Sequence, residues 1–398
     1  MALKSTKSTD KTPQVLVLQG GGALGSYQAG VYETMHGAEL EPNWVAGISI
    51  GAINAALIAG NLPEDRVSRL REFWDLVSSE LTAIAPADDG FARRWFNEIS
   101  AAAVAAMGAP GFFRPRNPFS MNPDALTGDV SLYDTSPLRQ TLCDLIDFDL
   151  LNSSPMRVSL GAVNVVSGNF CWFDNRTQEI QPEHVMASGA LPPGFPPVVI
   201  DGEAYWDGGL VSNTPLQHVL DVAERTDLTI YQVDLFQARG NMPTDMVEVL
   251  RREKDIRYSS RTRFNTDAVQ QLEELRLAAA RLCEKLPPEL HDDPDVKKLT
   301  RIEAPGAVCI MHLINRREMH ESSSMDYEFS RASVNEHWKT GRSDLAISLA
   351  HPMWSERDTS HRGIVTHDLT NPAGARMRHA EDVRLFHESK GASTIPDS

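Results

Sequence analysis

The chain of 398 residues has few cysteines, more acidic than basic residues, and no long uninterrupted apolar run. Its four cysteines are far apart and form no CxxC pair, which argues against a disulfide framework and against a zinc site. The formal net charge of −16 argues against nucleic-acid binding, which needs clustered positive charge. No segment approaches the roughly 20 apolar residues that span a bilayer. These absences predict a cytoplasmic protein with reduced thiols, no nucleic-acid partner and no metal.

The chain divides into three regions by composition. Residues 1–12 are polar, contain three lysines and lack an apolar signal-peptide core, so we expect a disordered leader. Residues 13–240 hold most of the apolar β-runs and are predicted to form one α/β domain. Residues 241–398 are more helical and more charged, and are predicted to be a helix-rich C-terminal extension. One β-run in this extension, at about 308–314, is expected to add a further strand to the core.

One segment of the C-terminal extension has a clear helical period. Between Asp267 and Leu286 the apolar residues fall on one face of a helix: Val269, Leu272, Leu275, Ala279, Leu282 and Leu286. Such a stripe is the ordinary means by which a helix packs on its own domain. We therefore expect this packing rather than a partner-binding or membrane-binding helix.

Strands and helices alternate at the start of the α/β domain. Apolar runs at 15–19 and 44–48 each lead through a glycine turn into a helix, expected at 26–36 and 51–59. This repeated order predicts a mostly parallel central sheet with helices on both faces. We also expect a hairpin formed by 157–164 and 169–173 and a helix at 182–188. Two further core strands are expected at 229–235 and 308–314.

Ser49 lies in the second glycine turn, Gly47-Ile48-Ser49-Ile50-Gly51. A serine nucleophile at a sharp strand-to-helix bend needs small neighbours, because its backbone is strained and the strand and helix crowd together. The following helix points its N–H groups at the reaction centre and favours developing negative charge. A structural turn with an N-capping serine explains the same five residues, so this motif alone leaves both interpretations open.

The first glycine turn, Gly20–Gly25, fits two kinds of site. It satisfies G-x-G-x-x-G, a dinucleotide-binding pattern that also needs an acidic residue at the end of the next strand. Glu39 and Glu41 precede that strand, and its end carries Ser49 instead. The geometry therefore disfavours a dinucleotide site, and no other cofactor motif is present. It favours an oxyanion hole made of the N–H groups of Gly20, Gly21 and Gly22.

A serine hydroxyl becomes a good nucleophile only when a positioned base takes its proton. Ten histidines follow position 207, so a Ser–Asp–His triad stays open, although none of them lies in a motif that explains its position. Asp207 lies in such a motif, because it enters the turn Asp207-Gly208-Gly209 at the end of a predicted strand. An aspartate that bonds its own backbone in a turn explains the same residues. The residues alone do not decide between these interpretations.

Several short motifs over about residues 13–235 resemble, in their order, those of the patatin-like phospholipases. They are Gln19-Gly20-Gly21-Gly22-Ala23-Leu24-Gly25, Gly47-Ile48-Ser49-Ile50-Gly51, Ala187-Ser188-Gly189-Ala190-Leu191-Pro192-Pro193, Asp207-Gly208-Gly209 and Ser212-Asn213-Thr214-Pro215-Leu216. The resemblance implies a three-layer patatin-like fold and a lipid acyl hydrolase that uses a Ser–Asp dyad without histidine. The long C-terminal extension is similar to that of a bacterial subset of this family.

The resemblance also implies a role for each matching residue. Ser49 is the nucleophile that forms an acyl-enzyme, and Asp207 is the base. The glycines have supporting roles: Gly47 and Gly51 in the nucleophile elbow, Gly208 and Gly209 beside the base, and Gly20, Gly21 and Gly22 in the oxyanion hole. The chain departs from the family pattern at Gln19, where Asp is frequent, and at Leu24, where Arg or Lys is frequent. Neither change removes a backbone donor, but loss of a cation alters the expected preference for charged head groups.

Two segments are candidate walls of an acyl pocket. Gly111–Arg116, with Phe119 and Met121 close by, is expected to touch a lipid surface or cap the pocket, unless its phenylalanines are tucked into the core. Its candidate contact residues are Phe112, Phe113 and Arg114. The proline-rich turn 191–197 is expected to form a rigid pocket wall through Leu191 and Phe195. The expected partners are a lipid or acyl-ester substrate and, peripherally, a lipid surface.

Two alternatives to a lipid hydrolase stay open. One is a soluble-ester or polyester hydrolase on the same fold. The other is a non-catalytic, lipid-binding regulatory protein, because a fold does not guarantee an activity. The presence of both Ser49 and Asp207 favours an enzyme.

Overall fold

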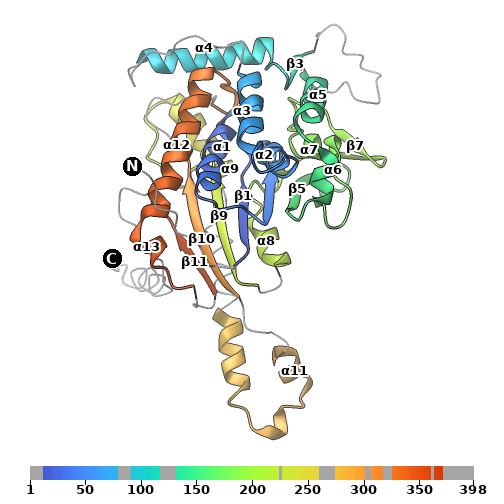
Figure 1. Ribbon diagram of the computed structural model, residues 1–398, viewed down its shortest axis with the longest axis vertical. Coiled ribbons are helices and arrows are strands. Elements are labelled where there is room, and N and C mark those ends of the chain that lie inside the picture. Colours follow the sequence, from blue (N-terminus) through green and yellow to red (C-terminus); the bar gives the residue numbers. More distant parts are fainter. Residues whose placement is uncertain are drawn as a thin grey trace, which may run out of the picture.

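The computed structural model describes most of the chain as one arrangement of strands and helices (Figure 1). The described residues are 12–78, 91–116, 131–223, 226–259, 274–300, 306–316, 325–359 and 363–370. The strands are β1 (Gln14–Leu18), β2 (Trp44–Ile48), β3 (Arg114–Pro115), β4 (Tyr133–Asp134), β5 (Arg157–Asn164), β6 (Phe170–Asp174), β7 (Val198–Ile200), β8 (Glu203–Asp207), β9 (Leu228–Asp234), β10 (Ala307–Ile314) and β11 (Gly363–His367).

Nine of these strands form one mostly parallel sheet, as predicted. Their order is β11-β10-β9-β1-β2-β5-β8-β7, and β6 pairs with β5. The strands from β11 to β5 are parallel to their neighbours. In contrast, β6 and β8 are antiparallel to β5, and β7 is antiparallel to β8. Strands β3 and β4 form a separate antiparallel pair.

The helices lie around this sheet. The α-helices are α1 (Ser26–Gly37), α2 (Ile50–Ala59), α3 (Arg66–Val77), α4 (Phe91–Met107), α5 (Ser136–Leu145), α6 (Phe148–Ser153), α7 (Pro182–Ser188), α8 (Leu216–Val222), α9 (Met246–Tyr258), α11 (Pro294–Thr300), α12 (Arg331–Ala350) and α13 (Pro352–Ser355). Short 3-10 helices are η1 (Gly22–Gly25), η3 (Gly208–Leu210), η4 (Pro288–Leu290) and η5 (Met325–Tyr327). Among the described helices, none combines the length and the apolar character needed to cross a membrane.

Both faces of the sheet are covered, because its central strands are apolar on both sides. In β1, Leu16 and Leu18 pack in the larger core, which includes residues of α1, α2 and α12. Val15 and Val17 point the other way and pack in a smaller core with α8. A continuous apolar run is typical of a parallel strand buried on both faces. The result is three layers, with helices on each side of the sheet.

Helix α12 lies against α1 in the same helical layer. A Cβ atom at Gly30 of α1 would lie 2.0 Å from the carbonyl oxygen of Trp338, and one at Gly341 of α12 would lie 2.0 Å from that of Tyr27. The two backbones can approach so closely only because both contact positions lack a side chain. Residues late in the chain therefore complete the core that the first residues begin, and β10 and β11 extend the same sheet.

Residues 274–300 form an arm that projects from the end of the sheet opposite α4 (Figure 1). Its helical residues 274–283 carry part of the apolar stripe that the sequence predicts to pack on the domain. In the structure Leu275 and Leu282 are 68% and 65% exposed. The prediction is wrong for these two leucines, because the arm leaves the body and presents them to solvent.

Most predicted elements agree with the structure to within one or two residues. Strand β2 and helix α7 have the predicted bounds, and β5 and β6 form the predicted antiparallel hairpin. Strands β9 and β10 each begin one residue earlier than predicted, and both lie in the core of the sheet. Residues 1–11 of the predicted leader lie outside the described residues.

Candidate active site

Ser49 and Asp207 meet because β2 and β8 end head to head along one edge of β5. Strand β2 pairs with β5 as far as Ile48, opposite Gly161. Strand β8 pairs with the next stretch of β5, where Asp207 lies opposite Ala162. The two strands run toward each other, so the residue after β2 lies beside the last residue of β8. The topology thus joins two residues that are far apart in the sequence.

Ser49 has a strained backbone, with φ 57° and ψ −125°. The bend requires glycine on either side. A Cβ atom at Gly47 would lie 2.3 Å from the carbonyl oxygen of Gly51, and one at Gly51 would lie 2.4 Å from that of Leu18. Such strain costs about 1–3 kcal/mol and persists only where the surroundings enforce it. Here it turns Ser49 out of the strand and onto the wall of a cavity.

Ser188, the last residue of α7, accepts hydrogen bonds from the backbone of the Ser49 elbow. The Ser49 N–H donates to the carbonyl oxygen of Ser188 at 3.1 Å and to its Oγ at 3.0 Å. The Ser188 hydroxyl in turn donates to the carbonyl oxygen of Gly161 at 2.6 Å. Sequence analysis includes Ser188 only as part of a motif. Its positioning role depends on contacts between distant segments.

The Asp207 carboxylate is buried and hydrogen-bonded. The Gly209 N–H donates to Oδ1 at 2.7 Å, and the Ser49 side chain interacts with the same carboxylate. Burial raises the pKa of Asp207 to about 7, although the hydrogen bond from Gly209 and the interaction with Ser49 oppose the shift. Asp207 is therefore a much stronger base than an ordinary carboxylate.

The glycine loop after β1 lies against Ser49. A Cβ atom at Gly20 would lie 3.0 Å from the Cβ of Ser49. The Gly20 N–H donates to the carbonyl oxygen of Asn213 at 3.2 Å. Within the described part of the chain, no protein acceptor engages the N–H groups of Gly21 and Gly22. Of the three N–H groups predicted to form an oxyanion hole, that of Gly20 is therefore already bonded within the protein.

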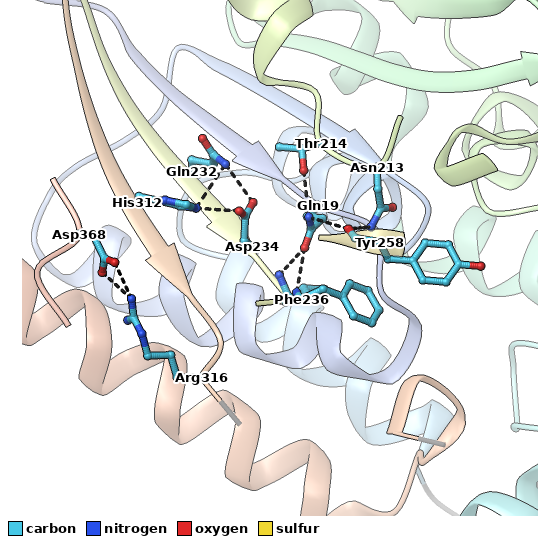
Figure 2. Close-up of polar contacts among 11 residues, drawn as sticks. Gln19, Asn213, Thr214, Gln232, Asp234, Phe236, Tyr258, His312, Arg316 and Asp368 are labelled. Atoms are coloured by element: carbon cyan, nitrogen blue, oxygen red, sulfur yellow. Dashed lines mark hydrogen bonds and ion pairs between the residues drawn. The ribbon is translucent and has the colours of Figure 1, made fainter. Parts of the chain in front are cut away.

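Gln19 fixes the start of the glycine loop through hydrogen bonds in several directions (Figure 2). Its Nε2 donates to Thr214 Oγ1 at 2.9 Å and to the carbonyl oxygen of Tyr258 at 3.2 Å. Its Oε1 accepts from the N–H groups of Leu235 and Phe236 at 2.6 and 3.0 Å. Gln19 is fully buried. One side chain therefore ties the loop to β9 and to the end of α9.

Asn213 also joins the glycine loop to the end of α9. Its Nδ2 donates to the carbonyl oxygen of Gly20 at 3.0 Å. It also donates to the carbonyl oxygen of Tyr258 at 3.0 Å (Figure 2). Its own carbonyl oxygen accepts from Gly20, as described above. Sequence analysis assigns no role to Asn213, since a lone asparagine in a short motif carries no signal of the partner it binds.

Ser49 opens onto a cavity of about 670 Å³, measured with its open mouth. Its lining includes Ser49, Asp207 and the three glycines of the loop, Gly20, Gly21 and Gly22. Most of the remaining lining is apolar: Ile50, Ile53, Phe112, Phe113, Leu191, Phe195, Phe236 and Phe329. Ser49 and Asp207 therefore face a space that is suited to an apolar group.

The segment after residue 240 supplies one wall of the cavity. Tyr258, Asp326, Tyr327 and Phe329 all line it. A Cβ atom at Gly22 would lie 2.2 Å from the carbonyl oxygen of Asp326, and Gly22 has a φ of 56°, so only glycine fits there. Lys254 of α9 pairs with the Asp326 carboxylate at 2.7 Å. Sequence analysis places none of these residues at the site.

Phe112 and Phe113 are 7% and 2% exposed, so the interpretation as exposed aromatics on a lipid surface is wrong. They lie in an aromatic cluster with Phe195 and line the cavity, as does Leu191. Arg114 lies on the surface instead, where it pairs with Asp134 at 2.8 Å. Phe119 and Met121 lie outside the described residues.

No histidine of the described ranges lines the cavity. His312 on β10 forms a pair with Asp234 at the end of β9, 2.7 Å between Nε2 and Oδ2 (Figure 2), but neither residue lines the cavity. The geometry therefore favours the dyad over the triad. Nor do the described residues bring together three or more side chains that could hold a metal ion.

Comparisons with known proteins cover both halves of the chain. A family model described as patatin-like phospholipase matches residues 16–220, and one described as patatin phospholipase matches residues 256–361. Among solved structures, the chain is similar to VipD from Legionella pneumophila, with 14% identity and a TM-score of 0.37. That match covers 85% of this chain and 66% of the VipD chain, just under two thirds of its length. No curated protein matches the chain.

Proposed function

The chain belongs to the patatin-like phospholipase family, and on this premise we propose that it hydrolyses lipid acyl esters with Ser49 and Asp207 as a catalytic dyad. One observation carries the proposal: Ser49 and the buried carboxylate of Asp207 line the same mostly apolar cavity, and the Ser49 side chain is close enough to lower the pKa of Asp207. A hydroxyl next to a base is the arrangement from which covalent acyl-enzymes form.

In the first half of the proposed reaction, Ser49 Oγ attacks the carbonyl carbon of the ester while its proton moves to Asp207. Negative charge then develops on the carbonyl oxygen, and the N–H groups of Gly21 and Gly22 stabilise it. When the tetrahedral intermediate collapses, the bond to the alcohol breaks and the alcohol leaves with the proton from Asp207. The acyl group remains on Ser49.

The second half reverses the roles. Water attacks the acyl carbon while Asp207 takes its proton, and a second oxyanion forms against the same two N–H groups. Collapse breaks the bond to Ser49 Oγ, which recovers the proton. The products are a free acid and the original enzyme, so no cofactor is required.

The raised pKa of Asp207 supports its assignment as the base. A general base works best when its pKa is near the working pH. An ordinary aspartate is too weak a base for this task, whereas burial brings the pKa of Asp207 to about 7. The same burial excludes water that would screen the developing charge.

The lining of the cavity supports an acyl chain as the group that is held. Phenylalanine rings make up much of the wall, and burial of apolar surface favours a hydrocarbon chain over a polar group. A phospholipid or a neutral lipid is the substrate class we favour. A soluble ester or polyester on the same dyad is the alternative, and the rates with each class distinguish them.

A fluorophosphonate probe tests the proposed function. We expect it to label the wild type at Ser49 and to leave folded Ser49→Ala unlabelled. Fatty-acid release from phosphatidylcholine, compared with hydrolysis of p-nitrophenyl esters of increasing chain length, then assigns the substrate class. A folded wild type that is neither labelled nor active on any ester contradicts the proposed function.

A further inference from the structure

Helix α9 directs polar side chains toward the protein and large apolar side chains toward solvent, the reverse of an ordinary surface helix. Its polar side chains face the protein: Asp255 is buried, Arg252 donates to the carbonyl oxygens of Gln237 and Ala238, and Lys254 pairs with Asp326. A surface helix normally packs its apolar stripe inward and presents charge to water. The orientation of α9 is therefore set by polar anchors rather than by burial of its apolar residues.

The outward face of α9 carries the large apolar side chains instead. Met246, Leu250 and Ile256 are 70%, 55% and 58% exposed, and Val249 on the same face is also exposed. Val249 and Leu250 follow Met246 by three and four residues, and Ile256 follows Val249 by seven, so the four side chains lie along one side of the helix. Glu253 and Arg257, which share this side, form an ion pair with each other. An exposed apolar stripe of this kind is typical of a site that contacts another protein, a ligand or a membrane.

The C-terminal end of α9 reaches the wall of the cavity. Tyr258, the last residue of α9, lines the cavity, and its carbonyl oxygen accepts from Gln19 and Asn213. On the other side, Leu210 and Val211 are exposed directly after Gly209, which also lines the cavity. Exposed apolar side chains thus lie next to two separate segments of the cavity wall.

We propose that the exposed stripe of α9, together with Leu210 and Val211, is the surface by which this protein docks on aggregated lipid; the proposal rests on the proposed lipid hydrolase function. An acyl chain that enters from a lipid surface avoids crossing water if the cavity opens against that surface. Flexible side chains such as Met246 enter a fluid lipid surface without a matching partner shape. With a net charge of −16, the chain has no overall attraction to anionic lipid, so apolar contact supplies the binding.

The test compares two double variants that remove equal numbers of exposed apolar side chains. Met246→Ser with Leu250→Ser alters the α9 face. Leu275→Ser with Leu282→Ser alters the arm, where exposure is similar but the segment projects from the body (Figure 1) and none of its described residues lines the cavity. Surface substitutions of this kind usually leave stability nearly unchanged. Binding to phosphatidylcholine vesicles, hydrolysis of vesicle lipid and hydrolysis of a soluble short-chain ester are measured for each.

We expect the α9 variant to lose at least about tenfold in vesicle binding and in vesicle hydrolysis, since each lost side chain removes apolar transfer free energy. Hydrolysis of the soluble ester stays within about twofold of the wild type, and the arm variant behaves as the wild type in all three assays. Equal loss in both variants, or no loss in the α9 variant, overturns the proposal. So does a wild-type dimer that the α9 substitutions dissociate, because a second copy then covers this face. Vesicle binding through α9 by a protein that hydrolyses no ester contradicts only the proposed function.

Discussion

The side-chain amide of Gln19 donates to the backbone carbonyl of Tyr258 at 3.2 Å, which joins the glycine loop to the C-terminal wall of the cavity. The same side chain accepts from two backbone N–H groups after β9. Glutamine offers a donor and an acceptor together, whereas an ionised aspartate offers acceptors alone. The departure from the family pattern at this position therefore suits a loop that must bind a carbonyl group of the C-terminal segment.

Gln19→Glu tests whether this donor positions the oxyanion loop. The variant keeps the shape of the side chain, but a carboxylate then faces the Tyr258 carbonyl oxygen. We expect the free energy of unfolding to fall by about 1–3 kcal/mol, the cost of a buried group without its partner. We also expect kcat to fall by up to about 100-fold, because the loop shifts relative to Ser49. Urea unfolding and steady-state kinetics measure both effects, with exposed Gln178→Glu as the control. Wild-type kcat in Gln19→Glu contradicts a positioning role.

The pH dependence of kcat/KM should report the titration of Asp207. Only the ionised carboxylate can take the proton of Ser49, and burial places its pKa at about 7. We therefore expect kcat/KM on a soluble ester to rise with pH through a single midpoint near 7 and then level off. Asp207→Asn should lower kcat/KM by at least about 100-fold at all pH values, the range for loss of a general base. A rising limb that persists in Asp207→Asn assigns the titration to another group.

Asp207 also makes the stability of the protein depend on pH. Its pKa is about 7 in the folded chain and 3.8 in the reference state, so the folded state holds this proton more tightly. The stabilisation from the neutral form is complete below pH 4 and is lost as the pH rises through 7. Asn mimics the neutral form. At pH 8 the free energy of unfolding of Asp207→Asn should therefore exceed that of the wild type by on the order of 4 kcal/mol. At pH 4 the two free energies should be equal. Denaturant titrations at the two pH values check this, and a difference that is the same at both pH values contradicts it.

The local parts of the site are predictable from short stretches of sequence. Gly47 and Gly51 indicate the elbow because a strained bend at Ser49 leaves no room for a neighbouring Cβ. The apolar runs of β1 and β2 indicate parallel strands because each strand is buried on both faces. These signals depend on residues within a few positions of one another, so spacing alone reveals them.

The remaining parts depend on contacts between distant segments, which spacing does not reveal. The wall formed by Tyr258 and Tyr327 comes from segments more than 200 residues after Ser49 in the sequence, and Gln19 and Asn213 bond the Tyr258 carbonyl oxygen. The sequence predicts that the Gly20 N–H belongs to the oxyanion hole, but in the structure it donates to the carbonyl oxygen of Asn213. The exposed leucines of the arm follow a helical period that is indistinguishable from that of a packed helix.

Substitution of Ser49 should separate the strain of the elbow from its chemistry. Ser49→Ala and Ser49→Gly both lack the nucleophile, so neither hydrolyses esters. The backbone at residue 49 has a φ of 57°, which glycine adopts without the steric cost that alanine bears. We therefore expect Ser49→Gly to be about 1 kcal/mol more stable than Ser49→Ala. Thermal unfolding of the two proteins measures the difference. Greater stability of Ser49→Ala indicates that the elbow is not strained.

Phe195→Ala tests whether the aromatic wall binds the acyl chain. The Phe195 ring lines the cavity and lies 5.2 Å from that of Phe113, between ring centroids, so its removal leaves part of a bound chain without apolar contact. We expect kcat/KM for an octanoyl ester to fall by about tenfold, which corresponds to the loss of one or two buried methylene contacts. An acetyl ester does not reach as far along the wall, so its kcat/KM should change by less than about twofold. Arg114→Ala, at a surface position beside the same aromatic segment, is the matched control and should leave both rates unchanged. Equal losses for the two esters in Phe195→Ala would show that the ring supports the dyad rather than the chain.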